Sequence, residues 1–295
     1  MGEQPQILVV GGTGMIGSAL LEELAGRAPV RVLAHTAASE AYLSHRHPEV
    51  EATAGDLADI STVRHAFDGI ECMFLLTPSV AAQRRLEENA LAAAAEAGVA
   101  RVVYLSNAEV GWGIELSRAH EATERRLQSS GVAHTVLRPD YLLDNLLHEL
   151  EELARGRVVA PSGSGRCAFV DARDVGAVAA AALLADRPIP GPLVLSGPEA
   201  LSWAELAERL SAALGAPIEH EDPDPAEWAR AAAAEGMPPW LAGALSEYFT
   251  RLQTRALTPS GDILWVTGRE PRSVEDFARD RLVPAWARHP VNATS

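Results

Sequence analysis

The sequence predicts an α/β fold: a doubly wound parallel sheet with a smaller, mostly helical C-terminal part. Short apolar runs alternate with helix-length segments through the first half of the chain, and a glycine-rich turn follows the first run. Beyond about residue 188 the pattern changes, because Pro188, Pro190 and Pro192 break the chain and five of the six tryptophans lie after residue 200. We therefore expect domains at residues 1–187 and 188–295, with residues of about 140–170 contributing to the binding cleft.

Apolar runs without polar alternation are typical of strands buried on both faces of a parallel sheet. They lie at Ile7–Val10, Val30–Ala34, Cys72–Leu76, Val102–Leu105 and Thr135–Leu137. Helices are expected between them, at about Met15–Ala25, Ile60–Phe67, Val80–Ala97 and Leu116–Ser129. This order indicates right-handed strand–helix–strand units. In the C-terminal part, Ser202–Leu214 predicts an amphipathic helix with Ser202 as its N-cap.

The charge balance excludes a nucleic-acid surface as the expected function. Forty acidic and 25 basic residues give the 295-residue chain a net charge of −15, the wrong sign for binding phosphates. No leader-like segment and no apolar run of about 18 residues occurs, so no membrane association is expected. Cys72 and Cys167 form neither a disulfide framework nor a metal-ligand spacing. We expect a reduced, cytoplasmic protein without a metal.

Every basic residue except histidine is arginine, and the chain contains no lysine. This composition excludes Schiff-base chemistry, a phosphate-binding-loop lysine and a catalytic Tyr-x-x-x-Lys pair. A GC-rich genome would explain the bias, but the chemical exclusion holds whatever its cause.

The most specific local pattern is ILVVGGTGMIG at Ile7–Gly17, where a buried strand meets a helix. It fits both G-x-G-x-x-G and G-x-x-G-x-x-G, in which glycines permit a tight turn, close approach to a pyrophosphate and close helix packing. The diphosphate of a dinucleotide would lie at the helix N-terminus, although a merely structural turn is the alternative. The residues expected to contact it are Gly11, Gly12, Thr13, Gly14, Met15, Ile16 and Gly17.

The end of the second strand favours NADP, with NAD as the alternative. A carboxylate there would bind the 2′-hydroxyl of NAD, but none occurs before Glu40. His35 and Thr36 can instead hydrogen-bond a 2′-phosphate. At the end of the third strand, Asp56 can accept from an adenine amino group or else cap the following helix. The other cofactor contacts expected at strand ends are Leu57, Leu76, Thr77 and Pro78.

Several motifs of moderate specificity occur in a characteristic order. They are Gly55-Asp56-Leu57, Tyr104-Leu105-Ser106-Asn107, His120-Glu121-Ala122-Thr123-Glu124, Ser130–Pro139 followed by Asn145, Phe169–Asp174 and Gly268–Phe277. With the glycine turn, they make nearly the whole chain resemble the atypical short-chain dehydrogenase/reductases of the NmrA-like type, in particular quinone oxidoreductase-like and triphenylmethane reductase-like members. The resemblance implies a Rossmann domain that binds NAD(P) and a small substrate-binding C-terminal domain that closes over a cleft.

The catalytic residues of typical short-chain reductases are largely missing. His120 stands where the lysine would be, Leu116 where the tyrosine would be, and only Ser106 is retained. Carbonyl reduction by the usual route is therefore not expected, because an alkoxide needs a proton donor. A quinone becomes a phenolate with a pKa near ~10, for which water or a weak donor suffices. We expect an NAD(P)H-dependent oxidoreductase that transfers a hydride to a quinone or another conjugated, aromatic small molecule.

The candidate catalytic residues are His120, Ser106 and Tyr141. His120 can protonate or orient the product, or contact the cofactor ribose; Ser106 can contact a ligand or cap a turn. The candidate substrate-binding residues are Asn107, Trp112, Tyr141 and Asn145, each with a packing or capping role as its alternative. Glu121 and Glu124 are expected to form a charged helix face with Arg125.

Two other functions stay open on the sequence. One is a non-catalytic NAD(P)-binding regulator or redox sensor, and the other is a dehydratase, isomerase or cyclase in which the cofactor is absent or structural. Preference for oxidised cofactor would indicate the first, and a product isomeric with its substrate would indicate the second. The expected partner is a small molecule, and the chain is expected to be a monomer or a homodimer.

Overall fold

The computed structural model describes residues 6–255 and 257–289. The chain forms two compact units, each discontinuous in sequence. Unit 1 runs through Gly111 and includes Ser117–Pro139 and Ala172–Val194. Unit 2 consists of Trp112–Leu116, Asp140–Asp171 and the chain from Leu195. The boundary expected at residue 187 thus falls within a segment of unit 1, and residues of about 140–170 belong to unit 2.

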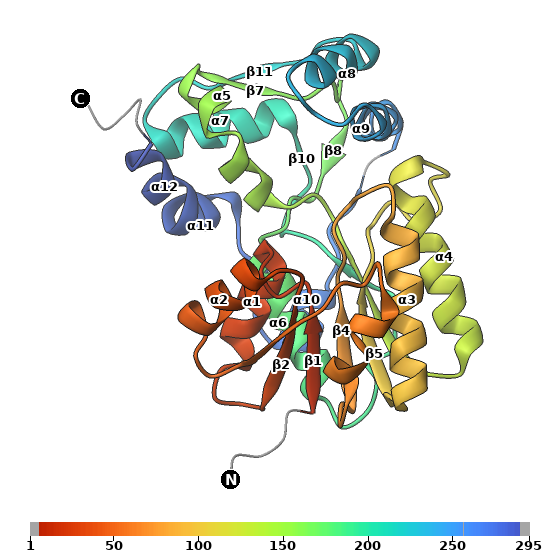
Figure 1. Cartoon of the computed structure of the whole chain (residues 1–295). Helices are drawn as coiled ribbons and strands as arrows, with labels where there is room; N and C mark the ends of the chain where they lie inside the picture. Colours follow the sequence, from red (N-terminus) through yellow and green to blue (C-terminus); the bar gives the residue numbers. More distant parts are fainter. Residues whose placement is uncertain (1–5, 256, 290–295) are drawn as a thin grey trace. The chain divides into compact units, whose positions relative to one another are not determined.

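Unit 1 is built on a seven-stranded sheet in the order β3-β2-β1-β4-β5-β6-β9 (Figure 1). Neighbouring strands from β3 to β6 pair in parallel, which confirms the predicted fold class. The strands are β1 (Ile7–Val10), β2 (Val30–Ala34), β3 (Glu51–Ala54), β4 (Cys72–Leu75), β5 (Arg101–Leu105), β6 (Ala133–Pro139) and β9 (Leu193–Leu195).

Helices pack on both faces of this sheet (Figure 1). Leu8 and Val10 of β1 share a buried cluster with Leu91 of α3, whereas Val9 approaches Gly12, which Leu21 of α1 also approaches. Alternate side chains of β1 therefore face opposite layers, as a buried parallel strand requires. The helices of unit 1 are α1 (Met15–Leu24), α2 (Ala37–Arg46), α3 (Gln83–Ala97), α4 (Glu115–Ser130) and α6 (Ala172–Leu184).

The segment expected as one helix at Ile60–Phe67 forms two short 3₁₀ turns instead, η1 (Ile60–Thr62) and η2 (Arg64–Phe67). The Asp59 carboxylate accepts from the backbone N–H of Ser61 and caps η1. Such tight turns rarely extend beyond three or four residues, so apolar periodicity alone overestimated the length of regular helix here. The expected helices at Met15–Ala25, Val80–Ala97 and Leu116–Ser129 all form, with ends that differ by at most three residues.

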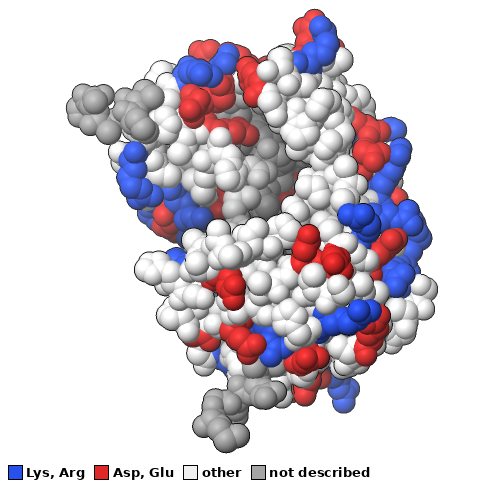
Figure 2. Space-filling view, in the orientation of Figure 1, with Lys and Arg blue, Asp and Glu red and all other residues white. Residues whose placement is uncertain are grey.

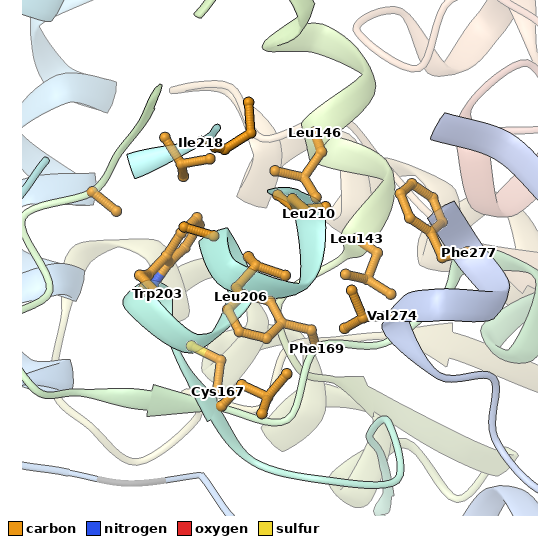
Figure 3. Packing of buried hydrophobic residues seen from close by; sticks show 14 of the residues in the cluster. Leu143, Leu146, Cys167, Phe169, Trp203, Leu206, Leu210, Ile218, Val274 and Phe277 are labelled. Atoms are coloured by element: carbon orange, nitrogen blue, oxygen red, sulfur yellow. The ribbon is translucent and has the colours of Figure 1, made fainter. Parts of the chain in front are cut away.

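Unit 2 is mostly helical, as predicted, and its core surrounds α7 (Trp203–Leu214). Ser202 caps α7 and forms a reciprocal capping box with Glu205. Figure 3 shows Leu206 and Leu210 of α7 packed among Leu143, Leu146, Val274 and Phe277 from two other segments. The remaining elements are η3 (Leu143–His148), α5 (Leu150–Ala154), β7 (Arg157–Val159), β8 (Arg166–Cys167), β10 (Leu201–Ser202), β11 (Glu219–Glu221), α8 (Pro225–Ala234), α9 (Pro239–Leu252), α10 (Asp262–Thr267), α11 (Val274–Phe277), η4 (Ala278–Leu282) and α12 (Val283–Ala287).

Charged side chains of both signs are interspersed on the face drawn in Figure 2. Many arginines pair with acids; Arg209, for example, contacts both Glu199 and Glu275. Within residues 6–255 and 257–289, none of the helices combines the length and apolar character needed to span a bilayer.

Close approach of α1 and α6 depends on a glycine. A Cβ at Gly176 would lie 2.8 Å from the backbone of Ala19 and Leu20, so a side chain there would separate the two helices. We expect Gly176→Ala to lower the free energy of unfolding by about 1–2 kcal/mol, because overpacking outweighs the helix propensity gained. Gly243→Ala in α9 is the control, since a Cβ there meets nothing within 4 Å. Urea unfolding of both variants checks this, and a Gly176→Ala protein as stable as wild type would contradict it.

Candidate functional site

The glycine turn lies where the strand order of the sheet reverses. β1 is flanked by β2 and β4, and ligands of open parallel sheets bind beyond the carboxyl ends of strands at such a point. Gly11 follows β1 with φ +89°, and a Cβ on it would lie 2.6 Å from the carbonyl oxygen of Leu76 after β4. A Cβ at Gly17 would lie 2.0 Å from the Gly11 carbonyl oxygen. Sterics therefore require glycine at both ends of this turn.

Gly14 differs from these two glycines because protein packing does not require it. A Cβ there would meet only the Gly11 oxygen, at 3.6 Å, which is an ordinary contact. Gly14 is the N-cap of α1, and no side chain caps the helix or places an acid in its first turn. The space and the helix N-terminus together fit a dinucleotide pyrophosphate, which takes hydrogen bonds from such N–H groups.

The predicted nucleotide-selecting residues lie at neighbouring strand ends. His35 after β2 is highly exposed, and its Nδ1 lies 3.5 Å from Oδ1 of Asp56 after β3. Asp56 also accepts from the backbone N–H of Ala58 at 2.8 Å, but it does not cap the following 3₁₀ turn η1, whose N-cap is Asp59. Thr36 forms a capping box with Ser39 at the start of α2. Of these groups, the exposed imidazole of His35 fits a phosphate ester. The side chains of Thr36 and Asp56 already accept hydrogen bonds from backbone N–H groups.

A buried carboxylate lies beside the end of β4 in unit 1. Glu87 of α3 is 0% exposed, and hydroxyl and amide groups surround it. Its donors are Thr77 Oγ1 at 3.0 Å, Gln83 Nε2 at 3.1 Å, Tyr104 Oη at 3.1 Å and Thr123 Oγ1. His120 joins this group, with Nδ1 2.7 Å from Tyr104 Oη and Nε2 3.2 Å from Gln83 Nε2. The structure thus brings the predicted residues Thr77 and His120 together around one carboxylate.

A second buried carboxylate holds Ser106. The Ser106 hydroxyl donates to Glu124 at 2.6 Å, and Arg138 donates to both oxygens of the same side chain. Glu124 is only 4% exposed, so its expected place on a charged helix face is wrong. Glu121 does pair with Arg125 on the outer side of α4, at 3.9 Å. The two glutamates differ because Glu124 lies on the same face of α4 as buried His120 and Leu127.

In unit 2, aromatic rings surround the predicted substrate-binding residues. Trp112 stacks on Tyr248 with centroids 6.1 Å apart, and Tyr141 stacks on the same ring at 6.4 Å. The Arg255 guanidinium lies over Trp112 at 5.7 Å. Burial raises the pKa of the Tyr141 phenol well above its ordinary value, and a hydrogen bond with Asn145 opposes the shift. Three of the four predicted substrate residues, Trp112, Tyr141 and Asn145, therefore belong to one cluster; Asn107 lies in unit 1 after β5.

Glu149, between η3 and α5, was not a candidate on the sequence. Burial raises the pKa of its carboxyl to about 7, with a further contribution from the charge of Glu152. Its own charge contributes to the raised pKa of Tyr141, so the two groups are electrostatic neighbours. No sequence pattern indicated this carboxyl, because it stands in a short irregular turn without helical or strand periodicity.

Periodicity would have indicated that Glu87 is buried, although not which residues it contacts. Gln83, Glu87, Leu91 and Ala94 recur at helical spacing on the buried face of α3, and a glutamate in such a series is expected to have internal partners. In the parts of the chain that the structure describes, no group of three or more His, Cys, Asp or Glu side chains is placed to hold a metal ion.

Glu149→Gln tests this partly buried carboxyl through its pH dependence. Because the folded-state pKa lies above the ordinary value of 4.5, the contribution of Glu149 to wild-type stability falls as pH rises from about 4.5 to 7 and then levels off. Glutamine carries no charge, so the variant should match wild type near pH 4.5 and exceed it at pH 8 by roughly 1–3 kcal/mol. Denaturant unfolding at both pH values measures this. Glu151→Gln, at an exposed position, is the control, and parallel pH curves for wild type and Glu149→Gln would rule out the shift.

Comparison with known proteins agrees with this architecture. The model of the NmrA-like family matches residues 3–227. An NAD(P)H azoreductase from Xenophilus azovorans is 33% identical over 92% of this chain and 96% of its own. A (4-alkanoyl-5-oxo-2,5-dihydrofuran-3-yl)methyl phosphate reductase from Streptomyces griseus is 32% identical over 93% and 97%.

Among solved structures, the NADPH complex of the quinone oxidoreductase QOR2 from Escherichia coli superposes with a TM-score of 0.84. Its sequence is 23% identical, and the match covers 92% of this chain and 98% of that one. At this identity the superposition establishes the fold alone. Membership of the family is established by the family model and by the two relatives that are more than 30% identical. The chain is a member of the NmrA-like family.

Proposed function

We propose that this protein is an NAD(P)H-dependent reductase that transfers a hydride to a quinone or another conjugated, aromatic small molecule. The observation that carries the proposal is the glycine turn, where Gly14 leaves space beside the N-terminus of α1 at the reversal of the strand order. Family membership supports it, because the relatives described above are named as reductases.

The relatives also support the class of acceptor. Their named substrates and activities involve an azo compound, a quinone and a ring double bond conjugated with carbonyl groups. Each of these acceptors is a conjugated system in which negative charge developing on hydride addition is delocalised. In unit 2, the rings of Trp112 and Tyr141 would contact a flat substrate of this kind.

NADP is the proposed cofactor. No carboxylate ends β2, and the exposed imidazole of His35 would bind a 2′-phosphate. Asp56 beside it would keep the imidazole oriented. The E. coli quinone oxidoreductase was solved with NADPH, which supports the same choice.

The polar groups at the end of β5 and just after it suit an acceptor that needs no strong acid. When bound, NADPH would supply the hydride from its nicotinamide ring. The Ser106 hydroxyl is already committed to Glu124. Burial raises the pKa of Tyr104, which opposes its ionisation. These residues would position ligands, and solvent water would supply the proton that completes a hydroquinone.

Reduced-cofactor binding and turnover test the function directly. We expect calorimetry to show micromolar binding of NADPH, weaker binding of NADH, and oxidation of the bound cofactor by benzoquinones, naphthoquinones or azo dyes. Absorbance of the reduced nicotinamide follows turnover. Binding of only the oxidised cofactors would indicate a sensor, and binding without turnover across the panel would refute the reductase activity. A product isomeric with its substrate, at constant NADPH, would indicate non-redox chemistry.

Gly14→Ser tests the pyrophosphate site without disturbing the fold. Serine is a favoured N-cap, so its hydroxyl should accept from the free N–H groups of α1 and keep or raise the melting temperature. The same hydroxyl would occupy the space meant for the pyrophosphate, and we expect NADPH to bind at least about tenfold more weakly. Gly243→Ser, on the exposed side of α9, is the matched control. Unchanged NADPH affinity in Gly14→Ser would place the nucleotide elsewhere.

A further inference from the structure

We propose that Glu87 is the positioning residue of this site: through Tyr104, its buried carboxylate holds His120 as the neutral Nδ1–H tautomer, so that His120 accepts a hydrogen bond at Nε2 and donates no proton to substrate. The inference rests on the hydrogen bonds that connect Glu87, Tyr104, His120 and Gln83 in unit 1. It deepens the proposed function by assigning His120 an orienting role in place of an acid role.

The first step concerns the carboxylate. Oε1 of Glu87 accepts hydrogen bonds from Thr77 and Gln83. Its Oε2 accepts hydrogen bonds from Tyr104 and Thr123. Four donors directed at two oxygens match an ionised carboxylate, which only accepts hydrogen bonds. A buried charge without such partners would be strongly destabilising. Glu87 therefore acts as a fixed acceptor that dictates where neighbouring hydrogens lie.

The second step follows the single hydroxyl proton of Tyr104. That proton is directed at Glu87, so the phenol oxygen must accept from the other neighbour, Nδ1 of His120, at 2.7 Å. Nδ1 therefore carries the proton of the imidazole. In a neutral ring Nε2 is then bare and accepts from the amide nitrogen of Gln83 at 3.2 Å, while the second amide hydrogen goes to Glu87.

With Glu87 ionised, no other arrangement satisfies every group. With the proton on Nε2, or with a doubly protonated ring, an imidazole N–H would face the amide N–H of Gln83. Exchanging the positions of the Gln83 amide nitrogen and oxygen would remove this N–H to N–H contact. It would also direct the amide oxygen at the Glu87 carboxylate, so that two acceptors would face each other. Only the neutral Nδ1–H tautomer avoids an unpaired buried group.

Burial acts in the same direction as the hydrogen bonds. His120 is 8% exposed, and burial lowers the pKa of its imidazole, although the negative charges of Glu87 and Glu124 oppose the shift. The ring therefore stays uncharged at neutral pH. At Nε2, a hydroxyl group of a bound nucleotide or substrate can replace the Gln83 amide as donor, which would orient that ligand without transfer of a proton.

Nitrogen NMR of the full-length protein with labelled histidine tests the tautomer without any ligand. We expect His120, assigned by loss of its signals in His120→Gln, to show a protonated Nδ1, a bare Nε2 and no titration between about pH 5.5 and 8.5. In Glu87→Gln and Tyr104→Phe the proton should redistribute between Nδ1 and Nε2, because the acceptor that fixes the Tyr104 hydroxyl, or that hydroxyl itself, has been removed. His65→Gln, at an exposed position, is the control, since it should change only its own signals. If either variant fails to fold, the wild-type spectrum decides alone: a protonated Nε2, or titration near pH 6.5, would overturn the proposal.

Kinetics then separate orientation from acid catalysis. In His120→Gln we expect KM to rise about tenfold, because an acceptor contact has been altered, while turnover slows no more than a few fold and keeps its pH profile. Turnover slowed by about two orders of magnitude or more, with loss of a limb in the pH profile, would identify His120 as the acid and refute the inference. If wild type neither binds nor oxidises NADPH, the proposed function fails, whereas the NMR result still decides the tautomer.

Discussion

Helix α1 leaves strand β1 through a turn that has no room for side chains at its two ends, and the nucleotide site depends on this constraint. Because a Cβ at Gly17 would lie 2.0 Å from the Gly11 carbonyl, the helix can approach the strand only through glycine. That approach places the N-terminus of α1 where the strand order reverses, beside the residues that follow β4. At Gly11 and Gly17 the space for a side chain is filled by protein atoms, whereas beside Gly14 it is open. A local steric requirement thus positions the N–H groups that an anionic ligand needs.

The second organising feature is a pair of buried glutamates near the ends of β4 and β5. Each is stabilised by several donors, and each is connected to one residue that the family resemblance marks as part of the reaction site. Glu124 accepts a hydrogen bond from Ser106, and Glu87 is linked through Tyr104 to His120. Buried charges are retained only when their hydrogen-bonding groups are satisfied, so these networks make the polar side chains rigid. Rigid acceptors suit chemistry that relies on orientation more than on proton transfer.

Much of the architecture could be read from local patterns. Continuous apolar runs identified five of the seven sheet strands, since strands buried on both faces lack polar alternation. β3 was expected only as a third strand before Gly55, and the short β9 was not predicted, because Glu51–Ala54 is partly polar and Leu193–Leu195 has only three residues. Ser202 was recognisable as a cap because it stands directly before an amphipathic helix, and the structure adds Glu205 as its capping partner.

The sequence by itself determined the parallel α/β fold, the glycine turn and the absence of a Tyr-x-x-x-Lys pair, because each depends on neighbouring residues or on composition. Only the tertiary structure decided that Glu124 is internal, that Glu87 meets Tyr104 and His120, and that Trp112 and Tyr141 stack on Tyr248. These partners come from different elements and lie up to 136 residues apart along the chain, between Trp112 and Tyr248. The protonation and orientation of a side chain follow from its spatial neighbours, and spacing along the chain does not specify them.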